Sequence, residues 1–201
     1  MVYRGDWLGR LRHWAIRRKD SPGDGGGNEA PVDRFLPCLK IVLHHEGGWA
    51  DHPKDPGGAT MRGVTLATYQ KFLGRKATKD ELRRISDGEL EAIYRSYYWE
   101  PAACGRMPSG VDLVVFDMAV NAGVKRAIRI LQESVASPAD GIVGPQTLAA
   151  VAKQDPLFLI RQYSDGRRAF YQGLGAYVTF GRGWLRRVDE VEAEAIKGAK
   201  K

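Results

Sequence analysis

One segment of the chain is apolar nearly all round, namely VDLVVFDMAV at residues 111–120. A segment of this kind, opening after Ser109 and Gly110, predicts a central helix that is buried on every side. Asp117 and Asn121 lie four residues apart and therefore share one face of this helix. We expect Asp117 to be a buried structural partner and Asn121 to line a binding cleft.

Outward from this segment, almost every stretch beyond Val32 predicts a helix. In the first, Phe35, Leu39, Val42 and Glu46 share one face, and Gly47 and Gly48 end the helix. Thr78 to Glu81 and Ser86 to Glu89 are capping-box patterns, each opening a short helix, and Gly144-Pro145 is a further start signal. Apolar positions at helical spacing follow, and they are Leu90, Ile93, Tyr94, Tyr97 and Tyr98, then Ile160, Tyr163, Phe170 and Leu174, then Trp184, Val188, Val191 and Ala195. The exception is Trp49 to Val64, where Gly, Pro and Asp predict a small hairpin or an ordered loop. We therefore expect an all-α fold with one small irregular or β-hairpin segment.

Length and charge narrow the class of protein without choosing its partner. The chain has 201 residues, 43% hydrophobic and 27% charged, as in an ordinary globular domain. Its net charge of +7 favours polyanions, meaning nucleic acid, anionic lipid or an acidic cell-wall polymer. Six arginines contribute a basic C-terminal region, and they are Arg161, Arg167, Arg168, Arg182, Arg186 and Arg187. No helix-turn-helix, zinc-finger or RNA-recognition pattern accompanies them, so we expect no nucleic-acid partner.

A basic head and a linker precede the main region. Residues 20–31 are rich in Gly, Pro, Asp and Ser, which predicts a flexible linker, so residues 1–31 form a first region. Within the head, Trp7, Leu11 and Trp14 follow helical spacing among arginines. Two interpretations stay open: an amphipathic segment touching anionic membrane through residues 1–20, or a frayed or partner-packed tail. Cys38 and Cys104 have no metal-ligand spacing and are predicted to be buried thiols, with a disulfide as the alternative.

Two carboxyl groups with contrasting surroundings follow the first helix, within HHEGGWADHPKDPGGATMRGVT at residues 44–65. Glu46 falls on the apolar face where the helix stops, and apolar neighbours favour the protonated form that a general acid needs. Asp55 lies nine residues on in a polar turn, where it should stay ionised. Such a pair is typical of glycoside hydrolases, and the Thr60 hydroxyl is placed to hold the attacking water. Alternatively, the two glycines are only a helix cap and Glu46 a solvated end residue.

Several separate motifs resemble glycoside hydrolase family 108, which comprises N-acetylmuramidases found as phage endolysins and as secretion-associated enzymes. The matching stretches are EGGW at 46–49, DPGGAT at 55–60, GVT at 63–65, YWEP at 98–101, PSGVD at 108–112, FDMAVNAG at 116–123, LQ at 131–132 and DGIVGPQTL at 140–148. The last of these resembles the peptidoglycan-binding half of the family. The resemblance covers roughly residues 32–197 and implies a lysozyme-like fold.

The resemblance implies roles for individual residues. The catalytic Glu of the family's EGG motif corresponds to Glu46. The Glu-to-Asp spacing is also similar to that of phage lysozymes, which suggests roles for Asp55 and Thr60, although the Asp-to-Thr spacing here is one residue shorter. As substrate-binding residues we expect Asn121, Tyr98, Trp99, Gly141 and Gln146. The alternative for Tyr98 and Trp99 is that both pack in the core. The alternative for Gly141 and Gln146 is that they belong to a structural turn and helix start. The regions expected are a muramidase region at 32–123 and a peptidoglycan-binding-like region at 124–201, packed as one unit.

We therefore expect a monomeric muramidase that cleaves the β-1,4 bond between N-acetylmuramic acid and N-acetylglucosamine in bacterial peptidoglycan during cell lysis. The alternatives are a lytic transglycosylase and a non-catalytic, wall-binding secretion accessory. We expect no cofactor and no metal, because adjacent histidines such as His44 and His45 point apart on a helix and no HExxH motif is present. Residues 1–20 lack the apolar run of a secretory signal. We expect synthesis in the host cytoplasm and action in the periplasm or wall after release through a holin or a secretion route.

Overall fold

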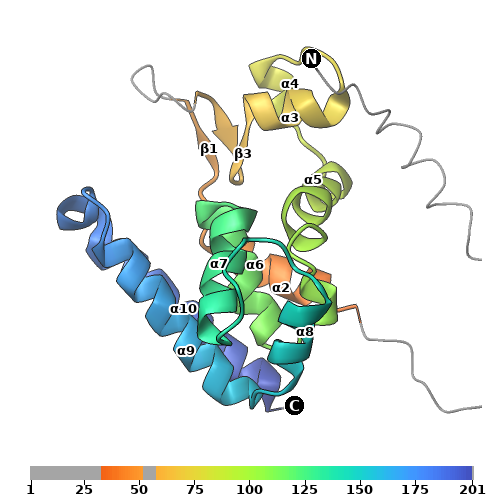
Figure 1. Cartoon of the computed structure of the whole chain (residues 1–201). Helices are drawn as coiled ribbons and strands as arrows, with labels where there is room; N and C mark the ends of the chain where they lie inside the picture. Colours follow the sequence, from red (N-terminus) through yellow and green to blue (C-terminus); the bar gives the residue numbers. More distant parts are fainter. Residues whose placement is uncertain (1–32, 52–57, 201) are drawn as a thin grey trace, which may run out of the picture. The chain divides into compact units, whose positions relative to one another are not determined.

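Helix α6 (Val111–Ala122) runs through the middle of the fold, as Figure 1 shows for this computed structural model. The structure describes residues 33–51 and 58–200. Residues 111–119 of α6 are all buried, which confirms the predicted central helix. Four helices pack against it: α2 (Phe35–His44), α7 (Val124–Ser134), α9 (Pro156–Gln172) and α10 (Tyr177–Ala199). The core of the protein therefore surrounds this one helix.

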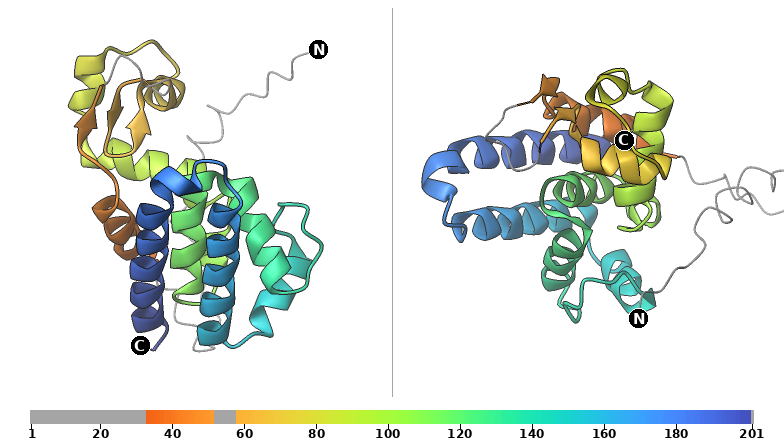
Figure 2. Two further views of the ribbon diagram at one scale, coloured as in Figure 1. Left: turned by 90° about the vertical axis from the view of Figure 1, so that its left-hand side faces the viewer. Right: turned by 90° about the horizontal axis from the view of Figure 1, so that it is seen from above.

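A small lobe follows α2 and is built on a three-stranded antiparallel sheet. Its strands are β1 (Trp49–Ala50), β2 (Thr60–Met61) and β3 (Val64–Thr65), in that order. Ala50 pairs with Thr60, and Thr60 pairs in turn with Thr65. Of the two alternatives for residues 49–64, the hairpin is therefore the one that forms. Helices α3 (Leu66–Leu73) and α4 (Lys79–Arg83) pack on this sheet at one end of the described fold (Figures 1 and 2).

The predicted helix boundaries agree with the structure at several ends. Thr78 and Ser86 cap α4 and α5 (Asp87–Tyr94) with complete capping boxes, and α8 (Pro145–Ala152) begins at Pro145. Helix α2 is shorter than predicted, because it ends at His44 rather than at Glu46. The amides of His45 and Glu46 donate to the carbonyls of residues 42 and 43, so the helix closes with tighter, three-residue hydrogen bonds. Glu46 therefore lies in the turn between α2 and β1.

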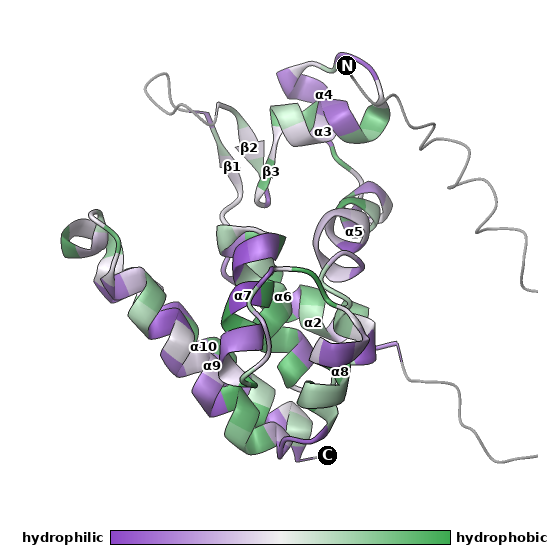
Figure 3. Cartoon of the chain, viewed as in Figure 1, coloured by the Kyte–Doolittle hydropathy of each residue, from purple (hydrophilic) through white to green (hydrophobic). Residues whose placement is uncertain are grey.

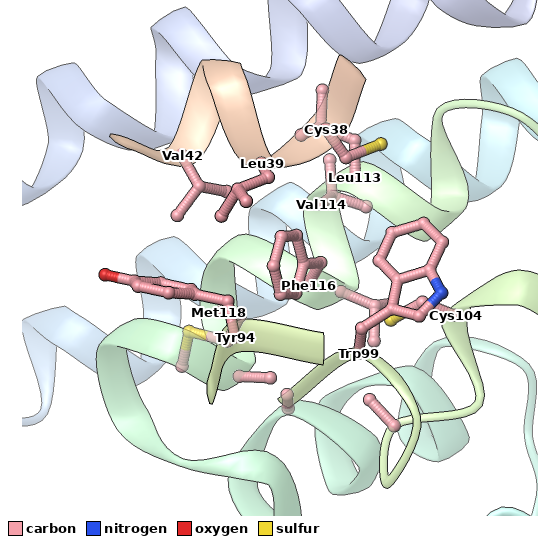
Figure 4. Close-up of a cluster of buried hydrophobic side chains, with 14 of the residues drawn as sticks. Cys38, Leu39, Val42, Tyr94, Trp99, Cys104, Leu113, Val114, Phe116 and Met118 are labelled. Atoms are coloured by element: carbon pink, nitrogen blue, oxygen red, sulfur yellow. The ribbon is translucent and has the colours of Figure 1, made fainter. Parts of the chain in front are cut away.

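A π-helical turn, Arg95–Trp99, continues α5 and alters which aromatic residue enters the core. An α-helical spacing from Tyr94 directs Tyr97 and Tyr98 inward, whereas the extra residue of a π-helical turn brings Trp99 inward instead. Trp99 is 3% exposed and its ring lies 5.2 Å from that of Phe116 between centroids. Figure 4 shows Trp99 within this cluster, beside Cys104. Cys104 and Cys38 are both buried free thiols, as predicted.

The C-terminal part contains α7 and α8, followed by a helical hairpin of α9 and α10. Helices α9 and α10 run antiparallel to each other (Figure 2), and apolar and polar residues alternate along both (Figure 3). Residues from Asp33 onward cluster as one unit. The boundaries at 31/32 and 123/124 stay predictions from the sequence. None of the helices in the described ranges is long and apolar enough to cross a membrane.

Candidate active site

The Glu46 carboxyl group lies where α2 gives way to the small lobe, and its side chain is 18% exposed. Arg187, on α10, donates from Nη2 to Glu46 Oε1 over 2.8 Å. The carboxyl is therefore half-buried, as the sequence predicts, but its surroundings are not simply apolar. The guanidinium at this distance makes a charge-assisted hydrogen bond that fixes the orientation of the carboxyl group. This neighbour is missed by sequence reasoning because 141 residues separate the two side chains along the chain.

Asp117 anchors Arg187 from the central helix. Its Oδ1 accepts from Arg187 Nε at 3.0 Å and from Nη2 at 2.7 Å, while Oδ2 accepts from Arg167. Asp117 and Arg167 are both fully buried. Although burial raises the pKa of Asp117, the two arginines lower it by more, so the net pKa shift is downward. Two cations and two anions, counting Glu46, thus form a balanced buried network, which confirms the structural partner predicted for Asp117.

Two of the six arginines that make the C-terminal region basic belong to this buried network. Arg167 is 0% exposed and Arg187 13% exposed, so neither is free to attract a polyanion. Burial lowers the pKa of Arg187, but Asp117 and Glu46 raise it by more, which keeps the guanidinium charged. A sequence signal for this role exists. Arg167 follows Tyr163 by four residues and precedes Phe170 by three, so it interrupts the apolar stripe of α9.

The turn between β2 and β3 covers the other oxygen of Glu46. Arg62 and Gly63 both have positive φ, 50° and 78°, as a two-residue hairpin turn of type I′ requires. A Cβ on Gly63 would stand 2.9 Å from Glu46 Oε2 and closer still to the Tyr94 hydroxyl. The Tyr94 hydroxyl donates to the Arg62 carbonyl at 2.9 Å and so holds this turn in place. Glycine at position 63 therefore allows the backbone to approach the carboxyl group.

Tyr94 and Tyr98 complete the described surroundings of Glu46. Burial first, and then the Glu46 charge, raise the pKa of both phenols, so both stay protonated and act as hydrogen-bond donors at neutral pH. Their rings lie 5.6 Å apart between centroids. Tyr98 is half-buried and keeps its place as a predicted substrate-binding residue. Its neighbour Trp99 does not, because the π-helical turn places that indole in the core, out of reach of a sugar.

The remaining predicted site residues differ in where the structure places them. Asp55 lies in residues 52–57 and falls outside the described residues, as do Trp7, Leu11 and Trp14 of the head. Thr60 is half-buried in β2, opposite Ala50. It lies two residues up the hairpin from the Arg62–Gly63 turn, about 7 Å by the rise of a strand.

Asn121 is exposed at the end of α6, one turn beyond Asp117, and its Oδ1 accepts from the Tyr171 hydroxyl at 2.6 Å. Gly141 and Gln146 belong to a separate turn. The Gln132 side chain organises that turn by accepting from the Gly141 amide and donating to the Ile142 carbonyl. Gly141, with φ +81°, is therefore accounted for as a turn residue, while the Gln146 side chain is exposed.

The part of the chain that the structure describes contains no cluster of metal-ligating side chains. Across residues 33–51 and 58–200, no three His, Cys, Asp or Glu side chains come together as a metal site would require. His45 lies 3.6 Å from Glu190, but burial and then Arg187 lower the pKa of the imidazole, which disfavours its charged form. The described site thus presents the half-buried Glu46 carboxyl group beside an arginine that Asp117 holds in place.

Comparisons with known proteins assign the chain to a family. Residues 39–123 match the family model described as glycosyl hydrolase 108, and residues 126–189 match one described as a predicted peptidoglycan domain. No curated protein matches the chain. Among solved structures, SagA of Brucella abortus is 41% identical with a TM-score of 0.76, and the match covers 83% of this chain and 96% of that one. The fold is thus lysozyme-like and mostly helical, as predicted. This protein belongs to the glycosyl hydrolase 108 family, and it is a peptidoglycan hydrolase with a peptidoglycan-binding region in its C-terminal half.

Proposed function

We propose that the protein is an N-acetylmuramidase that cleaves the β-1,4 bond between N-acetylmuramic acid and N-acetylglucosamine, with Glu46 as general acid. The observation that carries this proposal is the position of the Glu46 carboxyl group. It is half-buried, fixed by Arg187 on one oxygen, and approached by the Gly63 turn beside the other. A carboxyl group held in one orientation next to an accessible surface is the arrangement that general acid catalysis of glycoside cleavage requires.

The proposed reaction moves one proton from Glu46 to the glycosidic oxygen as the bond from that oxygen to the anomeric carbon breaks. The N-acetylglucosamine fragment leaves as an alcohol, and positive charge develops on the N-acetylmuramic acid ring. Asp55 stabilises this charge or orients water, with Thr60 assisting. Water then adds its oxygen to the anomeric carbon and passes one proton to a carboxylate, either Asp55 or the deprotonated Glu46, which leaves a neutral sugar with a reducing end.

Arg187 has a defined part in this proposal because a general acid must carry a proton when it acts. Glu46 receives one N–H from Arg187, whereas Asp117 receives two. When Glu46 takes up a proton, Arg187 therefore keeps its anchor on Asp117 and stays in place. Arg187 is thus a positioning residue that comes from the peptidoglycan-binding half.

We further propose an endolysin-type role in host-cell lysis, in which the protein acts in the periplasm or wall after release from the cytoplasm. Exposed Arg161, Arg182 and Arg186 support this setting, because an acidic wall attracts positive charge. Contact of residues 1–20 with an anionic membrane surface and a monomeric state are also proposals.

The test is to identify the products from purified peptidoglycan by mass spectrometry after borohydride reduction. The proposal predicts fragments with reduced N-acetylmuramic acid ends. Reduced N-acetylglucosamine ends would assign the other glycosidic bond, and 1,6-anhydro ends would assign a lytic transglycosylase. Binding without any fragment would leave a wall-binding accessory. Each of the last three outcomes overturns the proposed specificity.

A further inference from the structure

A series of aromatic rings crosses from α9 to α10, and it runs from a buried tyrosine to an exposed phenylalanine. We name Phe170, Tyr171, Trp184 and Phe180 the aromatic ladder. Successive ring centroids lie 5.4, 5.3 and 5.9 Å apart. The guanidinium of Arg126 covers the first ring, with its carbon 4.9 Å from the Phe170 centroid. The ladder therefore has a cationic end at Phe170 and an open end at Phe180.

Solvent exposure increases along the ladder from Tyr171 to Phe180. Tyr171 is 3% exposed, and its hydroxyl is held by Asn121. Trp184 is half-buried, and Phe180 is 56% exposed. An exposed phenylalanine next to a partly exposed tryptophan leaves apolar area in contact with water, which indicates a surface that takes a ligand.

The open end of the ladder leads along one helix face to the catalytic carboxyl group. Phe180, Trp184 and Arg187 follow each other at four and three residues, the spacing of a single face of α10. Arg187 contacts Glu46 directly. The seven residues from Phe180 to Arg187 span about 10 Å of helix, which is the length of a disaccharide. The ladder thus lies at the correct distance to hold the sugars next to the bond that Glu46 would protonate.

The chemistry of the ladder fits a glycan strand better than a bilayer. One side of a pyranose ring presents mainly C–H groups, which pack on the negative face of an aromatic ring, while its hydroxyl groups need polar partners at the edge. The Asn121 amide, whose oxygen accepts from the Tyr171 hydroxyl at the base of the ladder, provides such a partner. The ladder also lies within residues 126–189, the segment matched by the peptidoglycan model.

We propose that Phe180 and Trp184 form glycan-binding subsites in which successive sugars of the peptidoglycan strand stack beside the Glu46 centre. The inference rests on the proposed function, since it places the ladder's sugars relative to the bond that Glu46 cleaves. Binding energy gained at these subsites is remote from the reacting atoms, so it positions the scissile bond rather than performing the chemistry.

The first test compares Phe180→Ala with Phe158→Ala. The two phenylalanines are almost equally exposed, at 56% and 57%, but Phe158 lies in the first turn of α9, outside the ladder. In a Glu46→Gln background, which removes the chemistry, we expect Phe180→Ala to weaken binding to purified peptidoglycan about tenfold. Phe158→Ala should bind as the parent does. In the active background, Phe180→Ala should raise KM more for long strands than for the shortest cleavable fragment.

Trp184 provides a second readout that does not depend on activity. Soluble glycan fragments added to the Glu46→Gln protein should change the tryptophan fluorescence in a saturable way, and the conservative Trp184→Phe variant should abolish that change while still binding. Equal binding by both phenylalanine variants, or a fluorescence change that survives in Trp184→Phe, would overturn the inference. So would loss of anionic vesicle binding in Phe180→Ala with glycan binding intact, because that outcome assigns the ladder to a membrane. Failure of the wild type to cleave peptidoglycan would instead count against the proposed function.

Discussion

Replacing Gly63 by alanine should separate the catalytic geometry from the stability of the fold. The added Cβ would stand 2.9 Å from Glu46 Oε2 and closer to the Tyr94 hydroxyl, so both side chains must move. A residue with φ +78° also carries a backbone strain of about 1–2 kcal/mol when it has a side chain. Losing the Tyr94 hydrogen bond to Arg62 adds about 1 kcal/mol. We therefore expect the free energy of unfolding to fall by about 2–3 kcal/mol.

The loss of activity should be larger than this loss of stability explains. A displacement of the acid by about 1 Å is enough to lower turnover about 100-fold. The assay is hydrolysis of purified peptidoglycan at a temperature where urea unfolding shows the variant to be folded. Gly74→Ala is the matched control, because Gly74 also has positive φ (+67°) but nothing lies within 4 Å of its added Cβ. Gly74→Ala should lose stability and keep its turnover per folded molecule. If Gly63→Ala kept the same turnover as Gly74→Ala, the packing of the turn against Glu46 would have no catalytic role.

Three other substitutions test the buried charges and the hydroxyl that support Glu46. Asp117→Asn should lower the free energy of unfolding by about 3–5 kcal/mol in urea titrations, because Arg167 loses its buried counter-ion. The pKa of Asp117 is lower in the folded state than in the unfolded state, so its ionised carboxylate stabilises the fold above the ordinary carboxyl pKa. This stabilisation is lost as the pH falls towards the folded-state pKa. The free energy of unfolding of the wild type should therefore decrease below about pH 4, and that of Asp117→Asn should decrease less. Arg187→Gln should reduce kcat on peptidoglycan at least tenfold by releasing the Glu46 carboxyl group, whereas Arg186→Gln, on an exposed position of the same helix, should not; equal rates would remove Arg187 from the site. Tyr94→Phe deletes only the hydroxyl bonded to Arg62, so thermal unfolding should show a loss of about 1 kcal/mol and kinetics a larger loss of kcat, and an unchanged kcat would contradict the role of the turn.

Local patterns were enough to predict the elements that local chemistry determines. The uniformly apolar segment at 111–120 gives the buried α6, and the Thr78 and Ser86 capping boxes begin α4 and α5 where expected. Glu46 was predicted as the catalytic acid from a few adjacent residues, namely its position after an apolar helix face and before two glycines, together with the resemblance to the family's EGG motif, and its role stays a prediction. These predictions share one property: every residue that decides them lies within about four positions in sequence.

The rest of the site depends on contacts that no local pattern contains. Arg187 reaches Glu46 across 141 residues, and its charge in the sequence is indistinguishable from that of the exposed Arg186. For Trp99 the sequence left open a sugar contact or a place in the core, and the π-helical turn that decides for the core is not visible in the phase of a regular helix. Arg167 is the one residue whose sequence position indicated the buried network, since a charged residue within an apolar stripe requires a buried partner.

The most direct test of Glu46 as the general acid is the rate at which Glu46→Gln solubilises purified peptidoglycan, measured against wild type and against Glu133→Gln. Glu133 is exposed on α7, so its substitution makes the same chemical change away from the site. An amide keeps the shape of Glu46 but has no proton to donate, and removal of a general acid typically lowers the rate about 10²–10⁴-fold. We predict a loss of that size for Glu46→Gln, with binding to peptidoglycan retained and Glu133→Gln unaffected. Full hydrolysis by a correctly folded Glu46→Gln protein would contradict the assignment and require another residue as the acid.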